Sequence, residues 1–142
     1  MDYETDVVRG LKEDAFEYGA EADDLLDTAE AFEAASLAIM RETGNAARAA
    51  EFERQASETR NLASIKADLR DHAWWMADSM VVNAAAAELV RRTPGAEFID
   101  DVGRIRRRRW TDLLAEESGV PWYRVGHIAY EQTRAAREQA RP

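Results

Sequence analysis

The stretch NAARAAEFERQASETRNLASIKADLRDHAWWMADSMVVNAAAAELVRR, residues 45–92, contains neither proline nor glycine. Apolar and small residues recur in it at steps of three and four, the period of an amphipathic helix. They are Phe52, Ala56, Thr59, Leu62, Ile65, Leu69, Ala73, Met76, Met80, Asn83, Ala87 and Val90. We therefore predict one long helix, or two collinear helices if Ser57 or Asn61 caps a second start. One of the adjacent Trp74 and Trp75 is expected to reach a neighbouring helix or another subunit, because both cannot lie on one narrow seam.

The preceding segment, from Glu4 to Glu42, shows the same spacing over more than four heptads. Its seam positions are Val8, Leu11, Ala15, Tyr18, Ala22, Leu25, Ala29, Phe32, Ser36 and Ile39. This spacing predicts a second long helix. Gly44 is expected to end it and Asn45 to cap the helix that follows.

Thr93-Pro94-Gly95 is the clearest break in the chain, and shorter helices are predicted after it. They cover Ala96–Arg108, Thr111–Glu117 and Pro121–Gln139. No segment alternates like a strand, so the expected fold class is all-α. Charge separates the parts, because residues 1–103 carry 10 basic and 23 acidic residues, net −13, whereas residues 104–142 carry nine arginines and five acids, net +4. We predict an acidic long-helix bundle over residues 1–93 and a basic short-helix segment over residues 96–142.

The composition argues against several classes of function. Without cysteine, the chain has no disulfides, thiolate metal sites or cysteine nucleophiles. His72 and His127 are far apart in the sequence, and no metal-ligand spacing or phosphate-binding glycine loop accompanies them. We therefore expect a protein that is not an enzyme and that uses no metal, cofactor or small-molecule substrate. No apolar run reaches the ~18 residues of a membrane span, and the acidic N-terminus is unlike a secretory signal. These features predict a cytoplasmic protein, or one carried in a particle assembled in the cytoplasm.

The balance of charged residues indicates a source. The chain has 28 acidic and 19 basic residues, and only Lys12 and Lys66 are lysines. High acid content with scarce lysine is typical of proteins from halophiles that accumulate salt, where a carboxylate shell keeps the protein hydrated while charge repulsion is screened. A high-GC actinobacterial source is the alternative, which accounts for the arginine better than for the acid.

The stretch TDLLAEESGVPWYRVGHI, residues 111–128, carries a local signal. Ala115 is a small residue where one helix closes on the next, Gly119 suits a left-handed turn, and apolar residues follow at Val120, Val125 and Ile128. This pattern resembles the helix-turn-helix of many repressors. The resemblance implies that Trp122, Tyr123, Arg124 and His127 face the major groove, and that Arg104 and the arginines up to Arg109 bind phosphates. The acidic helices would then serve to form a dimer.

A broader pattern covers residues 20–125: alanine-rich long helices with an Asp23-Asp24-x-Leu26 stretch, a breaker, and an arginine-bearing tail. It resembles the helical head–tail adaptors of tailed viruses. The resemblance implies a ring-forming structural subunit of a virion from a halophilic host, a homo-oligomer that contacts portal-like or tail-like proteins. Aromatic residues and arginine usually anchor interfaces. The expected docking residues are therefore Trp110, Trp122, Tyr123, Arg106, Arg107, Arg108 and Arg109. The DNA-binding regulator is kept as the alternative function, with DNA as its partner.

Overall fold

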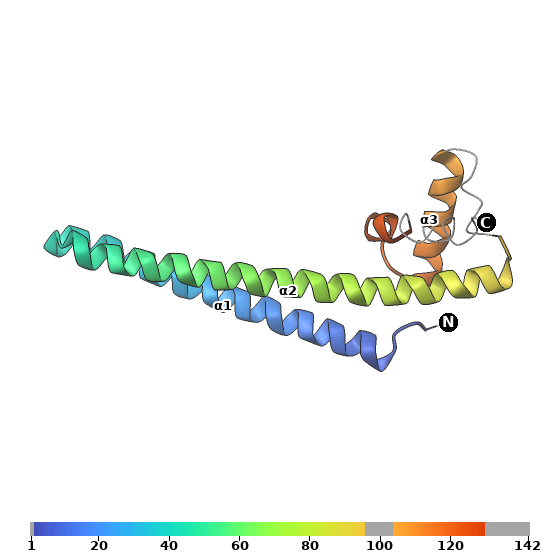
Figure 1. Cartoon of the computed structure of the whole chain (residues 1–142), viewed down its shortest axis with the longest axis horizontal. Coiled ribbons are helices and arrows are strands. Elements are labelled where there is room, and N and C mark those ends of the chain that lie inside the picture. Colours follow the sequence, from blue (N-terminus) through green and yellow to red (C-terminus); the bar gives the residue numbers. More distant parts are fainter. Residues whose placement is uncertain (1, 96–103, 130–142) are drawn as a thin grey trace, which may run out of the picture. The chain divides into compact units, whose positions relative to one another are not determined.

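The computed structural model describes residues 2–95 and 104–129, with the side chains of 104–109 outside this description. Helix α1 spans Asp6–Thr43, α2 spans Ala46–Arg92 and α3 spans Arg104–Ser118, and residues 122–129 form a further helical segment (Figure 1). Every regular element in these ranges is a helix. The all-α class, with two long helices followed by short ones, is therefore confirmed, and residues 46–92 form one continuous helix rather than two.

The turn between α1 and α2 forms as the sequence predicts. Gly44 adopts a left-handed φ of 63°, and its N–H donates to the carbonyl of Met40 at 3.2 Å, which closes the end of α1. Asn45 then caps α2, because its Oδ1 accepts a hydrogen bond from the N–H of Arg48 at 3.1 Å. At the other end of α1, Thr5 Oγ1 accepts from the N–H of Val8 at 3.2 Å.

The chain divides into two compact units, and one of them is Lys12–Trp74. In it, the part of α1 that precedes the turn and the part of α2 that follows it form an antiparallel hairpin. The seam of α1 matches the prediction, since all ten expected positions are buried or half-buried. Its fully buried members are mostly small, and they face an equally small set on α2: Ala49, Ala56, Ala63 and Ala73. Small residues at a helix contact let the two helices approach each other more closely than large ones do. Gly19 of α1 is packed against α2 as well, since a Cβ there would lie 3.3 Å from the side-chain Cδ of Arg70.

The seam predicted for α2 is correct only as far as Thr59. Beyond Thr59, the buried or half-buried positions along this face of α2 are Ala63, Lys66, Arg70 and Ala73. Leu62, Ile65 and Leu69 are exposed. The prediction took a step of three after Thr59, toward larger side chains, where the helix takes a step of four. The same shift leaves Met76, Met80, Asn83 and Ala87 exposed, while Ala73 and Val90 were placed correctly as buried or half-buried. The physical reason is that this seam is lined mostly by alanine, so the small side chain of Ala63 fits there, whereas leucine and isoleucine lie outside it.

Polar contacts also tie the hairpin together. The Ser36 hydroxyl donates to the carbonyl of Ala49 at 2.9 Å, and ion pairs join Arg60 to Glu33 at 2.7 Å and Lys66 to Glu21 at 2.6 Å. Trp74 packs edge-on against Phe16 of α1, with ring centroids 5.4 Å apart. This confirms that one of the two adjacent tryptophans reaches a neighbouring helix, whereas Trp75 is exposed.

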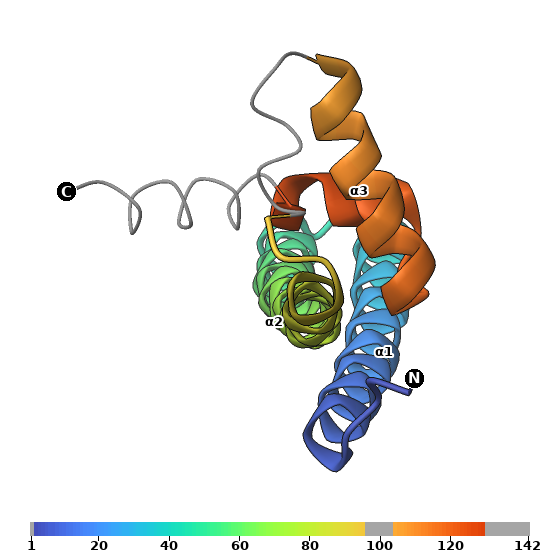
Figure 2. The same cartoon turned by 90° about the vertical axis from the view of Figure 1, so that its right-hand side faces the viewer.

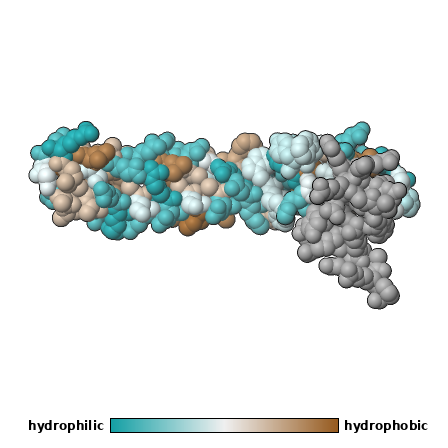
Figure 3. Space-filling view, turned by 90° about the horizontal axis from the view of Figure 1, so that it is seen from above, coloured by the Kyte–Doolittle hydropathy of each residue, from teal (hydrophilic) through white to brown (hydrophobic). Residues whose placement is uncertain are grey.

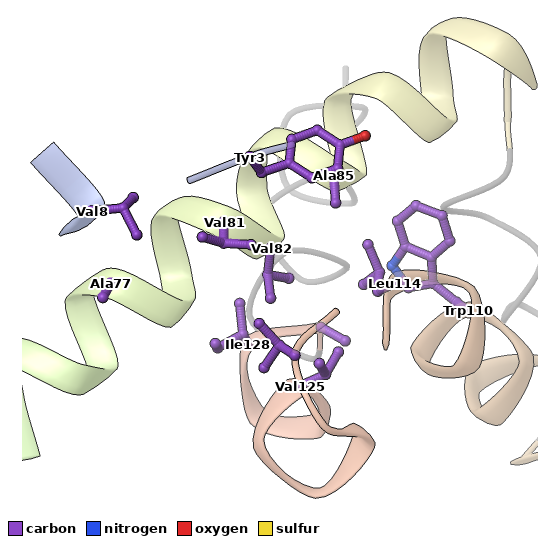
Figure 4. Close-up of a cluster of buried hydrophobic side chains, with 12 residues drawn as sticks. Tyr3, Val8, Ala77, Val81, Val82, Ala85, Trp110, Leu114, Val125 and Ile128 are labelled. Carbon is purple, nitrogen blue, oxygen red and sulfur yellow. The ribbon is translucent and has the colours of Figure 1, made fainter. Parts of the chain in front are cut away.

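The second compact unit comprises Met1–Leu11 and Trp75–Pro142. In it, α3 and residues 122–129 lie on one side of the C-terminal half of α2 (Figure 2). Twelve buried side chains from all of these elements form its core (Figure 4). They are Tyr3, Val8, Ala77, Val81, Val82, Ala85, Trp110, Leu114, Val120, Val125, Ile128 and Ala129. The predicted division into an acidic part, 1–93, and a basic part, 96–142, follows charge rather than packing, and it stays a prediction.

Candidate interaction surface

The helical segment 122–129 is joined to α3 by a tight turn whose geometry follows from its residues. Gly119 has a φ of 75°, a conformation that costs other residues about 1–2 kcal/mol. Its N–H donates to the carbonyl of Ala115 at 3.0 Å, which ends α3. Pro121 then starts the next helix, and its carbonyl accepts hydrogen bonds from the N–H groups of Arg124 and Val125 at 2.9 and 3.1 Å. The order helix, glycine turn, helix is therefore present, as the sequence predicts.

The inner face of this segment is anchored in the core of its unit. Val120, Val125 and Ile128 are all buried, and Val125 is fully enclosed. Figure 4 shows Val125 and Ile128 directed toward Val82 of α2. A short helix held by three buried side chains presents its outer residues in a fixed direction.

The outer face carries two adjacent aromatic residues, Trp122 and Tyr123, which we call the aromatic surface. Each is 68% exposed, and the two rings meet edge to face with centroids 6.1 Å apart. His127 is also exposed. These three side chains are therefore open to solvent. The contacts expected from the sequence, with a partner chain or with the major groove of DNA, stay predictions.

Arg124 has a partner that the sequence did not indicate. Its Nε lies 3.3 Å from Oδ2 of Asp78, a residue of α2 that is only 7% exposed. The guanidinium itself remains partly open to solvent, with 44% of the side chain exposed. A buried carboxylate is costly unless it is paired, so this contact both satisfies Asp78 and fixes the segment on α2.

Trp110 is placed differently from the expectation that it docks against a neighbouring chain. It is 1% exposed and belongs to the core, where it packs with Leu114. Its indole N–H is buried without a hydrogen-bond partner in the described structure. For Arg104, Arg106, Arg107, Arg108 and Arg109, the backbone belongs to α3, but their side chains lie outside the described part of the chain. Their predicted contacts stay predictions.

A polar cluster fastens the N-terminus to the same unit. Tyr3 donates a 2.5 Å hydrogen bond to Glu117 Oε1, and that carboxylate also binds Arg92 at 2.5 Å. Burial, with the hydrogen bond to Glu117, raises the pKa of Tyr3 to about 12. The hydrogen bonds from Tyr3 and Arg92 lower the pKa of Glu117. Sequence reasoning missed this cluster, because a lone tyrosine ahead of a helix carries no periodic signal.

Within the described ranges, no three His, Cys, Asp or Glu side chains are grouped so that they can hold a metal ion. Among the described helices, none combines the length and the apolar character needed to cross a bilayer. Comparison with known proteins adds no family, since no protein-family model, curated protein or solved structure matches this chain.

Proposed function

We propose that this chain is a non-enzymatic structural subunit of a multi-chain assembly, and that the aromatic surface is where it binds a partner. The observation that supports this is the 68% exposure of both Trp122 and Tyr123 on a helix whose other face is buried. Tryptophan and tyrosine are the residues most enriched at energetically important interface positions. A rigid support lowers the entropy that such a contact costs on binding.

The more specific form of the proposal is a ring-forming head–tail adaptor of a tailed virus with a halophilic host. Two long helices with an alanine-lined seam, followed by short helices, support it in architecture. The excess of 28 acids over 19 bases supports the halophilic environment. The partners are then further copies of the chain and portal-like or tail-like proteins, in a virion assembled in the host cytoplasm.

The mass of the purified protein in molar salt, measured by light scattering after size exclusion, tests the proposal. We expect a species several times the 16.0 kDa of one chain. Replacing Trp122 and Tyr123 together with alanine should give a monomer of unchanged helicity. Trp75→Ala removes a tryptophan that is 51% exposed on α2 and serves as the matched control. A wild-type monomer in molar salt, or an oligomer indifferent to the double substitution, argues against the proposal.

A second candidate is the helix-turn-helix regulator, which is favoured by the left-handed Gly119 and by the buried Val120, Val125 and Ile128. Trp122, Tyr123, Arg124 and His127 would then face DNA. The pairing of Arg124 with Asp78 weakens this candidate, because a base-reading arginine would have to share its charge with a buried carboxylate. Binding to a random-sequence duplex at low salt tests it: affinity should fall steeply with added salt and on Arg124→Ala.

A further inference from the structure

The aromatic surface can meet a partner only in the direction in which its short helical segment is held. Figure 3 shows the apolar residues of the long helices set among hydrophilic ones, whereas Trp122 and Tyr123 stand next to each other. The core and the pair of Arg124 with Asp78 hold the middle and the end of residues 122–129. The beginning of this segment follows the turn after α3. Whatever holds the end of α3 therefore also directs the aromatic surface.

Glu117 lies at that end of α3, one residue before Ser118 closes the helix. The turn that follows is short and hydrogen-bonded. The N–H of Gly119 donates to the carbonyl of Ala115 at 3.0 Å, and the N–H of Val120 donates to Ser118 Oγ at 3.1 Å. A turn whose backbone groups are paired in this way has little freedom to absorb a shift, so a displacement of Glu117 also displaces the helical residues beyond it.

Two side chains hold the Glu117 carboxylate, and they respond differently to salt. Arg92 Nη2 lies 2.5 Å from Oε1, but the arginine side chain is 47% exposed. Salt screens such an exposed ion pair, because the Debye length is about 3 Å at 1 M. The Tyr3 hydroxyl donates to the same oxygen at 2.5 Å, and it belongs to a residue that is only 8% exposed. Because this donor is neutral and buried, its hydrogen bond is the contact that persists in concentrated salt.

Tyr3 is itself held in a fixed place. Its ring belongs to the core of the unit, and Figure 4 shows it next to Ala85 of α2. The backbone on either side is hydrogen-bonded, since Asp2 Oδ1 accepts from the N–H of Glu4 at 2.9 Å and the Tyr3 carbonyl accepts from the N–H of Thr5 at 3.1 Å. The hydroxyl group therefore reaches Glu117 from a rigid support.

We propose that Tyr3 is a positioning residue for the aromatic surface, which it directs through its hydrogen bond to Glu117. This role rests on the proposed function, in which Trp122 and Tyr123 bind a partner, and it assigns the regulation of that binding to residues 2–5. All of these residues belong to one compact unit, Met1–Leu11 with Trp75–Pro142. Withdrawal of the N-terminal residues from the core then weakens the assembly, although the interface residues themselves are unchanged.

Light scattering of wild type and Tyr3→Phe over a dilution series in molar salt tests this role. Phenylalanine keeps the buried ring and removes only the hydroxyl. The apparent dissociation constant of the assembly should therefore rise about tenfold, the factor that a hydrogen bond to a charged group commonly contributes. The matched control is Ala63→Leu, which overpacks the other compact unit at a residue that is 3% exposed and should leave the constant nearly unchanged. An equal rise in the control, or no rise in Tyr3→Phe, overturns the inference.

Substitutions of Glu117 separate the hydrogen bond from the ion pair. Glu117→Gln keeps an oxygen that accepts from Tyr3 but loses the charge that binds Arg92, so the constant should stay near that of wild type in molar salt. Glu117→Ala loses both contacts and should match Tyr3→Phe. The double variant, Tyr3→Phe with Glu117→Ala, should be no weaker than either single variant, because both remove the same contact. Effects that add would refute the coupling between the two residues.

Hydrogen exchange of the dilute, monomeric protein, followed by mass spectrometry, needs no partner. The N–H groups of Arg124 and Val125, bonded to the Pro121 carbonyl, should exchange faster in Tyr3→Phe, whereas that of Gly44 should not. Equal exchange in the two proteins means that Tyr3 does not hold the segment. The wild-type mass separates the two proposals. A wild-type monomer refutes the proposed function and the regulation with it, whereas an oligomer that is insensitive to Tyr3→Phe refutes only the role of Tyr3.

Discussion

The Tyr3 hydroxyl and the Glu117 carboxylate, 114 positions apart in the sequence, are joined by a 2.5 Å hydrogen bond. Glu117 belongs to α3 and also binds Arg92 near the end of α2. Three segments of the chain, the N-terminus, the end of α2 and α3, therefore meet at one carboxylate. Bonds of this kind contribute modestly one at a time, but this one closes the longest loop of any side-chain bond described here.

Tyr3→Phe removes the hydroxyl while keeping the buried ring. We expect a loss of about 1–2 kcal/mol in the free energy of unfolding, the usual contribution of a hydrogen bond to a charged group. Urea unfolding followed by circular dichroism measures it. Tyr123→Phe, at a ring that is 68% exposed, is the control and should change little. Equal effects of the two substitutions would contradict a special role for Tyr3.

The dependence of stability on alkaline pH follows from the same residue. The pKa of Tyr3 is raised from 10.0 to about 12 in the folded chain by burial and by Glu117. The unfolded chain thus loses this proton near pH 10, while the folded chain keeps it. Stability from Tyr3 is fully present below pH 10 and is lost as the pH rises toward 12. Urea unfolding at a series of alkaline pH values should show a steeper fall for wild type than for Tyr3→Phe, and parallel curves would argue against the shift.

At acidic pH, the contribution of Glu117 to the stability of the fold depends on pH in the opposite direction. Hydrogen bonds from Tyr3 and Arg92 lower its pKa below the ordinary 4.5, so the folded state favours the ionised carboxylate. Its contribution is present above about pH 4.5 and is lost as the pH falls through the lowered value. Glu117→Gln should make the stability less dependent on pH in this range, as measured by thermal unfolding between neutral and acidic pH. A variant curve parallel to that of wild type would contradict the assignment.

The pair Arg124–Asp78 predicts an asymmetry between two alanine substitutions. Arg124→Ala leaves a carboxylate that is 7% exposed without this ion-pair partner, whereas Asp78→Ala leaves an arginine that already reaches solvent. The first should therefore destabilise more, by about 1–3 kcal/mol. The double variant should recover part of that loss, as a double-mutant cycle in urea would show. If the two single substitutions destabilise equally, and the double variant shows the sum of their effects, the two side chains are independent.

Much of this fold follows from the sequence, because the governing signals are local. The heptad spacing of α1, the turn at Gly44 and Asn45, and the glycine turn at Gly119 each depend on residues close together in the chain. These parts required no knowledge of distant neighbours.

The rest depends on contacts between distant residues. The predicted seam of α2 is wrong from Leu62 onward, because a step of three residues and a step of four residues are both compatible with a heptad. Only the facing alanines of α1 decide between the two. Asp78 and Tyr3 find their partners through tertiary packing, and neither stands in a pattern of its own. Trp110 was expected at an interface because aromatic residues often anchor interfaces, yet it is buried in a core that α2 and α3 share.

The corrected seam of α2 can be tested by a pair of adjacent substitutions. Ala63→Leu adds volume at a position that is 3% exposed in the seam between α1 and α2, and overpacking of this kind costs about 1–3 kcal/mol. Leu62→Ala, one residue away at a side chain that is 52% exposed, should cost far less. Urea unfolding of monomeric protein at low concentration compares them without the contribution of assembly. If Leu62→Ala instead costs more than Ala63→Leu, Leu62 lies on the seam and Ala63 does not.

Gly119, in the turn after α3, and Gly126, in the helical segment 122–129, should respond to alanine with opposite signs. Gly119→Ala forces a side chain into a φ of 75° and should destabilise by about 1–2 kcal/mol. Gly126 lies within the helical residues 122–129, and a Cβ there meets nothing within 4 Å. Gly126→Ala should therefore stabilise by about 0.5–1 kcal/mol, because alanine is the better helix former. Thermal unfolding measures both changes. If Gly126→Ala also lowers the mass of the assembly, a partner must approach the backbone at that glycine, and the interface extends beyond Trp122 and Tyr123.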